Sequence, residues 1–471
     1  MNDKEQSDIT RRRILQSTGL AAAAIPAAGL LGACATSGGG EDEDVALSDN
    51  PENPFDVDEK APLNVVIFNG GFGDSYAVDG HQVMYQEKFP EAKITNATEE
   101  DISSTQQPRF ADGEPPDVLD NSGAKKIAPD TLVKEGLLAE LTPLLEAPSY
   151  DDETVSVRDS LVPGALRPGF FTDPESGEEK LYYLNYAMGG WALWYDQKLF
   201  DDKGWTVPTS WDEMIALCAD IKKDGVAPWT YAGQHPYYLW DSLFTLASRH
   251  GGREVSQNID NLEPDAWKHD SIKLAAEALY SLQDKGYVLS GTPGINHTDS
   301  QTKWNHGEAA FLPCGSWLAN EQGDEAPEGF VYSAIGIPAL EGSKQPELVW
   351  SSGEEPFCVP AQAANKPGGY EYLRIMLSKE GSKIFSDKAQ SPSVLADQEI
   401  DNEPAKALAA LVTSEDNVYR PQIQDWYVDF KDRIEPVLGE MMAGETTPDD
   451  FIDAAQKAAD EIAEDDSVDK F

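Results

Sequence analysis

The stretch Leu-Asn-Val-Val-Ile-Phe-Asn-Gly-Gly at residues 63–71 decides the fold class. Its first six residues form a nearly continuous apolar run, which is typical of a strand buried on both faces. The Asn-Gly-Gly that follows predicts a tight turn. Strand-like segments come next at 93–95 and 116–120, and a helical segment is predicted at 132–145. This alternation favours α/β layers around a largely parallel sheet.

A second series of strands and helices begins near Lys180. Residues 181–195 form a long aromatic stretch typical of a strand, and Ser210 with Glu213 forms a capping box that starts a helix ending at Gly225. Two such series predict two lobes with a cleft between them, where small molecules commonly bind. The other elements predicted in this part are helices at 271–286, 370–377 and 449–462 and strands at 309–312 and 332–337.

The N-terminus has the pattern of an export signal. Arg11 and Arg12 form a twin-arginine pair, and a mildly apolar stretch broken by Pro26 follows them. That stretch is too weakly hydrophobic for a permanent membrane helix. It ends in Leu-Gly-Ala-Cys at residues 31–34, which resembles the lipobox of a secreted lipoprotein, so Cys34 is the predicted site of lipid attachment. The alternative is an ordinary amphipathic helix that happens to contain these residues.

Residues 34–61 are predicted to be an acidic, flexible tether. The Ser-Gly-Gly-Gly at 37–40 is flexible, and the Glu-Asp-Glu-Asp at 41–44 repels itself. Fully extended, residues 35–61 could reach roughly 90 Å. We therefore expect a folded body, held by lipid at the extracellular face of the cell membrane.

Composition excludes several classes of function. The 471 residues include 84 acidic and 36 basic ones, a net charge of −48, which repels nucleic acids and anionic lipid surfaces. The 4 cysteines are too few for a disulfide framework, and Cys218, Cys314 and Cys358 are predicted to be buried thiols. Such an acidic surface is usual in proteins that work at high salt, so we predict a halophilic source.

Four motifs in the same order resemble a known family. The chain is similar to the extracellular solute-binding proteins of sugar ABC transporters, the maltose-binding-protein type. Segments 355–361 and 377–380 are similar to its subgroup for N-acetylglucosamine and chitobiose. The motifs are Gly-Leu-Leu-Ala-Glu-Leu-Thr at 136–142, Trp-Tyr-Asp-Gln-Lys-Leu-Phe at 194–200, Pro-Thr-Ser-Trp-Asp-Glu at 208–213, and Gly-Glu-Ala-Ala-Phe at 307–311 with Gly-Ser-Trp at 315–317.

The resemblance implies a two-lobed α/β fold of the periplasmic-binding-protein type, with a sugar bound in the interlobe cleft. It implies crossings between the lobes near 184–190, 337–341 and 388–396. It also implies a monomer without enzymatic activity that delivers its ligand to ABC permease subunits. The expected divisions are an export signal at 1–33, the tether at 34–61, lobe 1 at 62–185, lobe 2 at 186–338, a return to lobe 1 at 339–390, and a C-terminal helical segment packing on both lobes at 391–471.

Candidate ligand residues follow from the chemistry of a sugar. Aromatic rings cover the apolar face of a pyranose, and carboxylates and amides bind its hydroxyl rim. The alternative for each Trp is ordinary core packing, and for each Asn or Asp it is a turn. The aromatic candidates are Trp191, Tyr237, Trp240, Trp317, Trp426 and Tyr427, and the polar ones are Asn69, Asp74, Asn121 and Glu355.

Other functions remain as alternatives. A secreted glycoside hydrolase needs a pair of facing carboxyl groups, and with 84 carboxylates a pair found by eye means nothing. A peptide-binding receptor is also conceivable. The 6 scattered His residues give no short-spaced metal motif, and the Gly-Gly-Phe-Gly at 70–73 lacks the Lys of a phosphate loop. No metal and no cofactor are expected.

Overall fold

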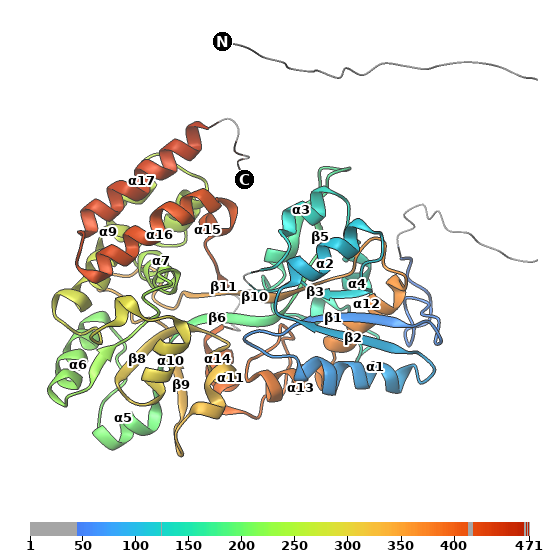
Figure 1. Ribbon diagram of the computed structural model, residues 1–471, viewed down its shortest axis with the longest axis horizontal. Coiled ribbons are helices and arrows are strands. Elements are labelled where there is room, and N and C mark those ends of the chain that lie inside the picture. Colours follow the sequence, from blue (N-terminus) through green and yellow to red (C-terminus); the bar gives the residue numbers. More distant parts are fainter. Residues whose placement is uncertain (1–44, 124, 413–417, 466–467, 469, 471) are drawn as a thin grey trace, which may run out of the picture. The chain divides into compact units, whose positions relative to one another are not determined.

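The computed structural model describes residues 45–123, 125–412, 418–465, 468 and 470. Arg11, Arg12 and Cys34 lie outside the described residues. In the described part, two lobes with separate hydrophobic cores share one sheet of nine strands in the order β2-β1-β3-β10-β6-β8-β7, with β11 beside β10 and β9 beside β6 (Figure 1). No helix of the described residues is both long enough and apolar enough to span a membrane.

Lobe 1 is built on three parallel strands. The apolar run identified in the sequence forms β1 (Leu63–Phe68), which lies between β2 (Ile94–Glu99) and β3 (Val118–Asp120). Figure 1 shows α1 and α13 on one side of these strands and α2 and α3 on the other. The remaining lobe 1 elements are η1 (Ala77–His81), α1 (Gln82–Lys88), α2 (Ile102–Ala111), α3 (Pro129–Lys134), α4 (Thr142–Glu146), η2 (Arg158–Ser160), η3 (Arg167–Gly169), β4 (Phe170–Thr172), β5 (Glu179–Leu181), α12 (Lys366–Met376) and α13 (Lys379–Ala389).

Lobe 2 is mostly helical. The predicted helix start at Ser210 is confirmed, because its hydroxyl accepts from the Glu213 N–H and the Glu213 carboxylate accepts from the backbone of Thr209. Cys218 is buried among the apolar side chains of this helix's inner face. The lobe 2 elements are α5 (Gln197–Lys203), α6 (Trp211–Lys223), β7 (Ala227–Trp229), α7 (Tyr237–Gly251), α8 (Glu254–Asp260), η4 (Ala266–Lys268), α9 (Asp270–Asp284), η5 (Thr292–Gly294), α10 (His297–Asn305), β8 (Ala309–Gly315), α11 (Leu318–Gln322), η6 (Gly323–Glu325), β9 (Tyr332–Ile335), α15 (Ile423–Trp426), α16 (Val428–Ala443) and α17 (Pro448–Glu464).

Two long strands join the lobes. The first half of β6 (Leu184–Asp196) pairs antiparallel with β10 (Val349–Cys358), and its second half pairs antiparallel with β8 and β9. The end of β10 pairs antiparallel with β3. The sheet is therefore mixed, which corrects the expected largely parallel sheet: the strand–helix units within each lobe are parallel, but the crossing strands run in opposite directions.

The second crossing lies later in the chain than expected, and the C-terminal segment has residues in the cores of both lobes. The buried Arg249 of α7 donates to the carbonyls of Ile337 and Leu348, so this segment is held on lobe 2 and the chain returns to lobe 1 along β10. Helix α14 (Glu403–Val412) contacts β6, β9 and β10, and β11 (Val418–Tyr419) pairs with β10. Helices α15 to α17 contribute instead to the core of lobe 2.

The predicted tether is too long at its C-terminal end. Phe55 and Val57 are buried in the core of lobe 1, and the ring centroid of Phe55 lies 5.5 Å from that of Tyr370. The Asn53 side chain donates to the Val57 carbonyl and accepts from the Val57 N–H, which closes a tight turn. Two apolar side chains and this turn outweigh the acidic, proline-containing character of the stretch.

Candidate functional site

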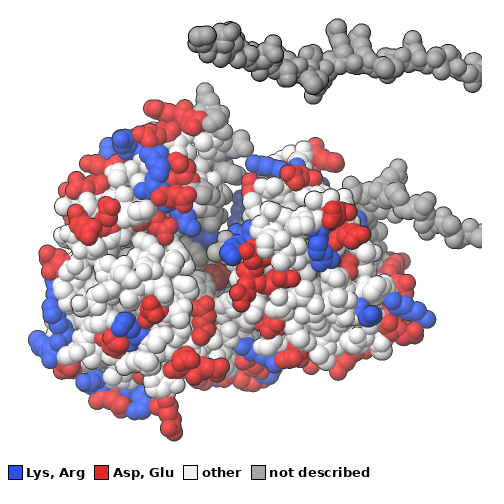
Figure 2. Space-filling model, in the orientation of Figure 1, with Lys and Arg blue, Asp and Glu red and all other residues white. Residues whose placement is uncertain are grey.

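The candidate site lies where the parallel strands of lobe 1 end against the crossing strands. Open α/β sheets bind ligands beyond the carboxyl ends of their strands. Asn69 follows β1, Asn121 and Ser122 follow β3, and Ser316 and Trp317 follow β8 of lobe 2. Figure 2 shows the surface hollowed between the part that carries α15 to α17 and the part that carries α2 and α3.

A pair of buried carboxyl groups stands at the lobe 1 edge of this site. The Ser122 hydroxyl contacts a carboxyl oxygen of Asp120 and lies 2.8 Å from Oε2 of Glu355. Burial raises the pKa of both carboxyls, and the charge of Asp120 raises the pKa of Glu355 further. One hydroxyl has one proton and cannot donate to both oxygens. Burial and the mutual repulsion of the two carboxyls therefore disfavour ionisation of both at once.

Glu355 has a backbone conformation unusual for a strand. Its φ of 55° lies in the left-handed region, which non-glycine residues seldom adopt. It lies between Glu354 and Pro356, both of which keep their pairing with β6. Such strain persists where the surroundings hold it and is commonly found at functional sites.

Glu354 connects the crossing strands to lobe 2. Its Oε2 accepts a hydrogen bond of 3.1 Å from the Ser316 hydroxyl, and its carboxylate lies over Gly189, where a Cβ would be only 2.0 Å from Cδ. Burial raises the pKa of Glu354 to about 7, although the positive charge of Arg420 and the bond from Ser316 oppose this. A glycine at position 189 is therefore required for the carboxylate to lie flat on the strand.

Aromatic rings gather at the lobe 2 edge. The ring centroid of Trp191 lies 5.8 Å from that of Trp317, 6.1 Å from that of Trp350 and 5.1 Å from that of Tyr238. Trp317 is half-buried, whereas the indole N–H of Trp191 is buried with no acceptor among the described residues. The Arg420 guanidinium lies 5.3 Å from the Trp350 ring centroid. These groups combine apolar faces with donors, as sugar recognition requires.

The four remaining aromatic candidates lie on α7 and at the end of α15. Tyr237 is half-buried at the start of α7, and the Lys431 ammonium lies 5.7 Å from its ring centroid. Trp426 is half-buried against the core of lobe 2, and Tyr427 beside it is buried. Trp240, one turn along α7 from Tyr237, is fully buried, with its ring stacked on Phe244 at a centroid distance of 5.4 Å. The structure thus places Trp240 in the core of lobe 2.

The polar candidates of lobe 1 differ in their availability. Asn69 is exposed, and Asp74 accepts a 2.9 Å hydrogen bond from the Thr98 hydroxyl while remaining partly exposed. Asn121 is fully buried, and its side chain both donates to and accepts from the backbone of Ile127 at 2.9 Å. Asn121 therefore closes a turn, which is the structural alternative considered for it.

Sequence reasoning missed six polar or aromatic residues of this site. Glu354 follows Ser-Ser-Gly in a segment too polar to indicate a buried strand, and Asp120 directly precedes the chosen Asn121. A signal that could have found Asp120 is its position as the last residue of a predicted strand. The missed residues are Asp120, Ser122, Ser316, Trp350, Glu354 and Arg420.

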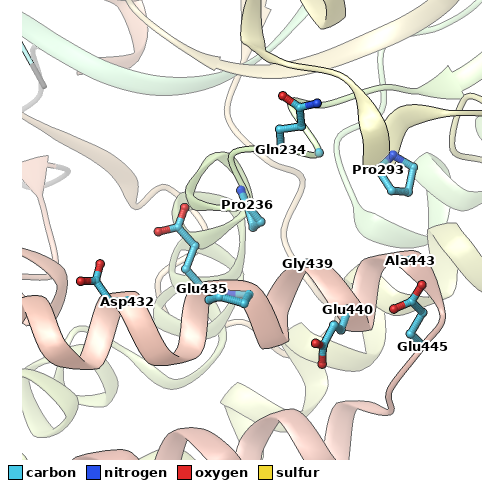
Figure 3. A pocket seen from close by; sticks show the side chains of 11 residues that line it. Gln234, Pro236, Pro293, Asp432, Glu435, Gly439, Glu440, Ala443 and Glu445 are labelled. Carbon is cyan, nitrogen blue, oxygen red and sulfur yellow. The ribbon is translucent and has the colours of Figure 1, made fainter.

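A separate pocket lies on lobe 2. Its volume is about 630 Å³, and Figure 3 shows α16 on one side and the turns carrying Gln234, Pro236 and Pro293 on the other. Glu435 on its wall accepts a 2.8 Å hydrogen bond from the backbone N–H of Tyr237. The pocket carries several carboxylates, but among the described residues no three His, Cys, Asp or Glu side chains are grouped as a metal site would need.

Comparison with known proteins identifies the family. A family model described as bacterial extracellular solute-binding protein matches residues 74–383, more than half of the chain. The chain belongs to this family. Among curated solute-binding proteins, the diacetylchitobiose binding protein NgcE of Streptomyces coelicolor is 30% identical over 428 residues, 89% of this chain and 88% of that protein. A multiple sugar-binding protein of Streptococcus mutans is 21% identical over 50% of this chain and 56% of that protein.

Solved structures of solute-binding proteins share the fold. A chitin oligosaccharide binding protein matches with a TM-score of 0.64 at 18% identity, covering 86% of this chain and 99% of that one. Apo RafE from Streptococcus pneumoniae matches with a TM-score of 0.67 at 18% identity, covering 86% and 98%. The predicted α/β fold of two lobes and the predicted family are thereby confirmed.

Proposed function

We propose that this solute-binding protein is the receptor of an ABC importer and binds a sugar or oligosaccharide between its lobes, of the N-acetylglucosamine or chitobiose kind. The observation that carries the proposal is the 30% identity to a diacetylchitobiose binding protein over nearly the whole of both chains. The chemistry of the site supports it, because aromatic rings and carboxyl groups face the same junction.

The two lobes take different parts in the proposed binding. Trp317 and Trp426 stack on sugar rings. The neighbouring aromatic side chains support these two rings or contact the sugar beside them; they are Trp191, Tyr237 and Tyr427. Asn69, Asp74, Glu354 and Glu355 bind the hydroxyls of the sugar. Closure of the lobes over the ligand, rather than chemistry, is the functional event, so the protein catalyses no reaction.

The N-terminal sequence supports a surface location. We propose export of the folded chain through the twin-arginine signal, lipid attachment at Cys34, and residence as a monomer on the extracellular face of the cell membrane. From there the receptor delivers its sugar to the permease subunits. The charge of −48 suits a high-salt environment, in which screening limits self-repulsion.

Calorimetric titration of the purified chain tests the proposal. The panel contains N-acetylglucosamine, N,N′-diacetylchitobiose, maltose, xylobiose, raffinose and a set of short peptides. We expect saturable binding of diacetylchitobiose and weaker or no binding of the other compounds. Saturable binding of peptides with no response to any sugar would overturn the proposal and favour a peptide receptor.

Incubation with the same oligosaccharides tests the enzymatic alternative. A glycoside hydrolase would release new reducing ends from chito- or malto-oligosaccharides, and this release would be lost in Glu355→Gln. We expect no new reducing ends over a long incubation, with the sugar recovered intact from the protein.

A further inference from the structure

Helix α11 of lobe 2 is hydrogen-bonded to lobe 1 on two sides. Nδ2 of Asn320 donates to the carbonyl of Gly71, in the turn after β1, at 2.7 Å. Nε2 of Gln390, at the end of α13, donates to the carbonyl of Ala319 at 3.2 Å. We call these two contacts the α11 clamp.

The lobe 1 side of the clamp is a preformed surface. Phe72, in the same turn as Gly71, is buried in the core of lobe 1, and its ring centroid lies 5.7 Å from that of Phe385 on α13. The turn and α13 therefore move together. Gln390 has a φ of 52°, a left-handed conformation that costs energy for a side chain other than glycine. Because backbone strain is commonly retained at functional positions, we infer that the contact of Gln390 with lobe 2 has a functional role.

The clamp also fixes the position of Trp317, one residue before α11. A Cβ on Gly71 would lie 2.8 Å from the Cβ of Trp317, so the backbone of the turn touches the base of this side chain. On its other side, the Trp317 ring lies over Gly315, where a Cβ would be 2.2 Å from the ring. Two glycines and the clamp leave this ring little freedom.

We propose that the α11 clamp holds the two lobes in the ligand-binding conformation, and that Asn320 and Gln390 are positioning residues that set sugar affinity without touching the sugar. The effect on affinity rests on the proposed function, whereas the clamp itself is independent of it. The apparent Kd of a ligand equals its intrinsic Kd divided by the fraction of receptor that is in the competent conformation. Loss of the clamp therefore weakens binding by lowering that fraction.

Hydrogen exchange of the ligand-free chain, followed by mass spectrometry, tests the clamp directly. The variants are Asn320→Ala, Gly71→Ala and Gln390→Asn, of which the last tolerates the left-handed conformation but is one methylene too short. The control for Asn320 is Asn258→Ala, an exposed residue of α8. The control for Gly71 is Gly294→Ala, because no atom lies within 4 Å of a Cβ at Gly294.

We expect faster exchange at 70–75 and 318–322 in all three variants, by about 5-fold, as for the loss of one hydrogen bond. The helices of each lobe core, such as α9 and α12, should exchange as in the parent. Exchange at 70–75 that matches the controls would overturn the clamp. A rise spread evenly over both lobes would also overturn it, since that is the signature of general destabilisation.

Titration with N,N′-diacetylchitobiose tests the effect on affinity. We expect Asn320→Ala and Gln390→Asn to weaken binding about 3- to 10-fold, with most of the change in the dissociation rate measured by stopped-flow Trp fluorescence. Unchanged or tighter binding, despite faster local exchange, would show that the clamp stabilises a conformation other than the binding one. A parent chain that binds no sugar would refute the proposed function, while the exchange experiment would still decide on the clamp.

Discussion

The lobe 1 edge of the site presents carboxyl groups, whereas the lobe 2 edge presents aromatic rings. At the first edge, Asp120 and Glu355 are buried and share the Ser122 hydroxyl. At the second, Trp317 remains half-exposed beside the buried Trp191. In the binding that we propose, the difference separates two tasks: carboxyls select the arrangement of sugar hydroxyls, and rings supply apolar contact area. Each edge should therefore respond to a different perturbation.

The largest expected effect concerns a ring that does not belong to the lobe 2 edge. Trp240→Ala removes a fully buried side chain from the core of lobe 2, so we expect a loss of about 3–5 kcal/mol in the free energy of unfolding. Chemical denaturation measures this loss. The fraction of the variant that remains folded should bind sugar as the parent does. A Trp240→Ala protein with the stability of the parent but impaired binding would show instead that Trp240 belongs to the binding site.

Substitution of the half-exposed rings should have the opposite pattern. We expect Trp317→Ala and Trp426→Ala each to weaken sugar binding by about 1–3 kcal/mol, roughly 5- to 150-fold in Kd. Their melting temperatures without ligand should stay close to that of the parent. Calorimetry and thermal melts decide, and a Trp317→Ala protein that melts far below the parent yet binds normally would make this ring part of the core.

The buried carboxyl of Glu354, which joins the crossing strands to lobe 2, should make stability depend on pH. Because burial raises the pKa of Glu354 to about 7, the folded state binds a proton more tightly than the unfolded chain does. Stability from this group is therefore fully present below about pH 4.5 and is lost as pH rises toward 7. We expect Glu354→Gln to remove on the order of 1–3 kcal/mol of the fall in unfolding free energy between pH 5 and 8.

Chemical denaturation of the parent and of Glu354→Gln at pH 5 and at pH 8 measures this change in unfolding free energy. Repulsion among surface acids is the same in both proteins, so it cancels when the two are compared. Trp317→Ala is the matched control from the aromatic edge, and its pH dependence should equal that of the parent. An identical pH dependence in Glu354→Gln and the parent would contradict the assigned protonation.

Salt should affect the body of the protein more than either edge of the site. With a net charge of −48, we expect the melting temperature to fall as NaCl is lowered below about 0.5 M, because the Debye length grows. The Kd for a neutral sugar should change by less than about 2-fold over the same range. A melting temperature independent of NaCl would remove the argument for a halophilic source.

The elements that the sequence predicted well are those with a local signal. The apolar run of β1 and the capping box of α6 each depend on neighbouring residues, and both are found as predicted. The crossing strand β10 was missed because its centre, Ser-Ser-Gly-Glu-Glu, is polar, and burial there comes from β6 and α14, far away in the sequence. No local pattern reports such contacts.

The sequence predicted the kind of binding site, but only some of the residues that form it. Asn121 and Asp120 are neighbours at the end of a strand, and only the geometry shows that Asn121 closes a turn while Asp120 meets Glu355. Trp240 and Tyr237 share a short aromatic segment, yet the helix turns Trp240 into the core. Which face of an element meets the cleft is set by tertiary packing, and a single sequence does not contain it.

The burial of Phe55 and Val57 shortens the tether between the proposed lipid anchor and the folded body of the receptor. Val45 also packs against the core of lobe 1, so if Cys34 carries the lipid, as we propose, 11 residues join the lipid to the folded body and span at most about 40 Å instead of roughly 90 Å. A lipid anchor diffuses in the plane of the membrane, so the body is confined to a layer whose thickness scales with the reach, and the receptor is about twofold more concentrated near the membrane than on the longer tether. Delivery of the sugar would then take place within about 40 Å of the membrane surface.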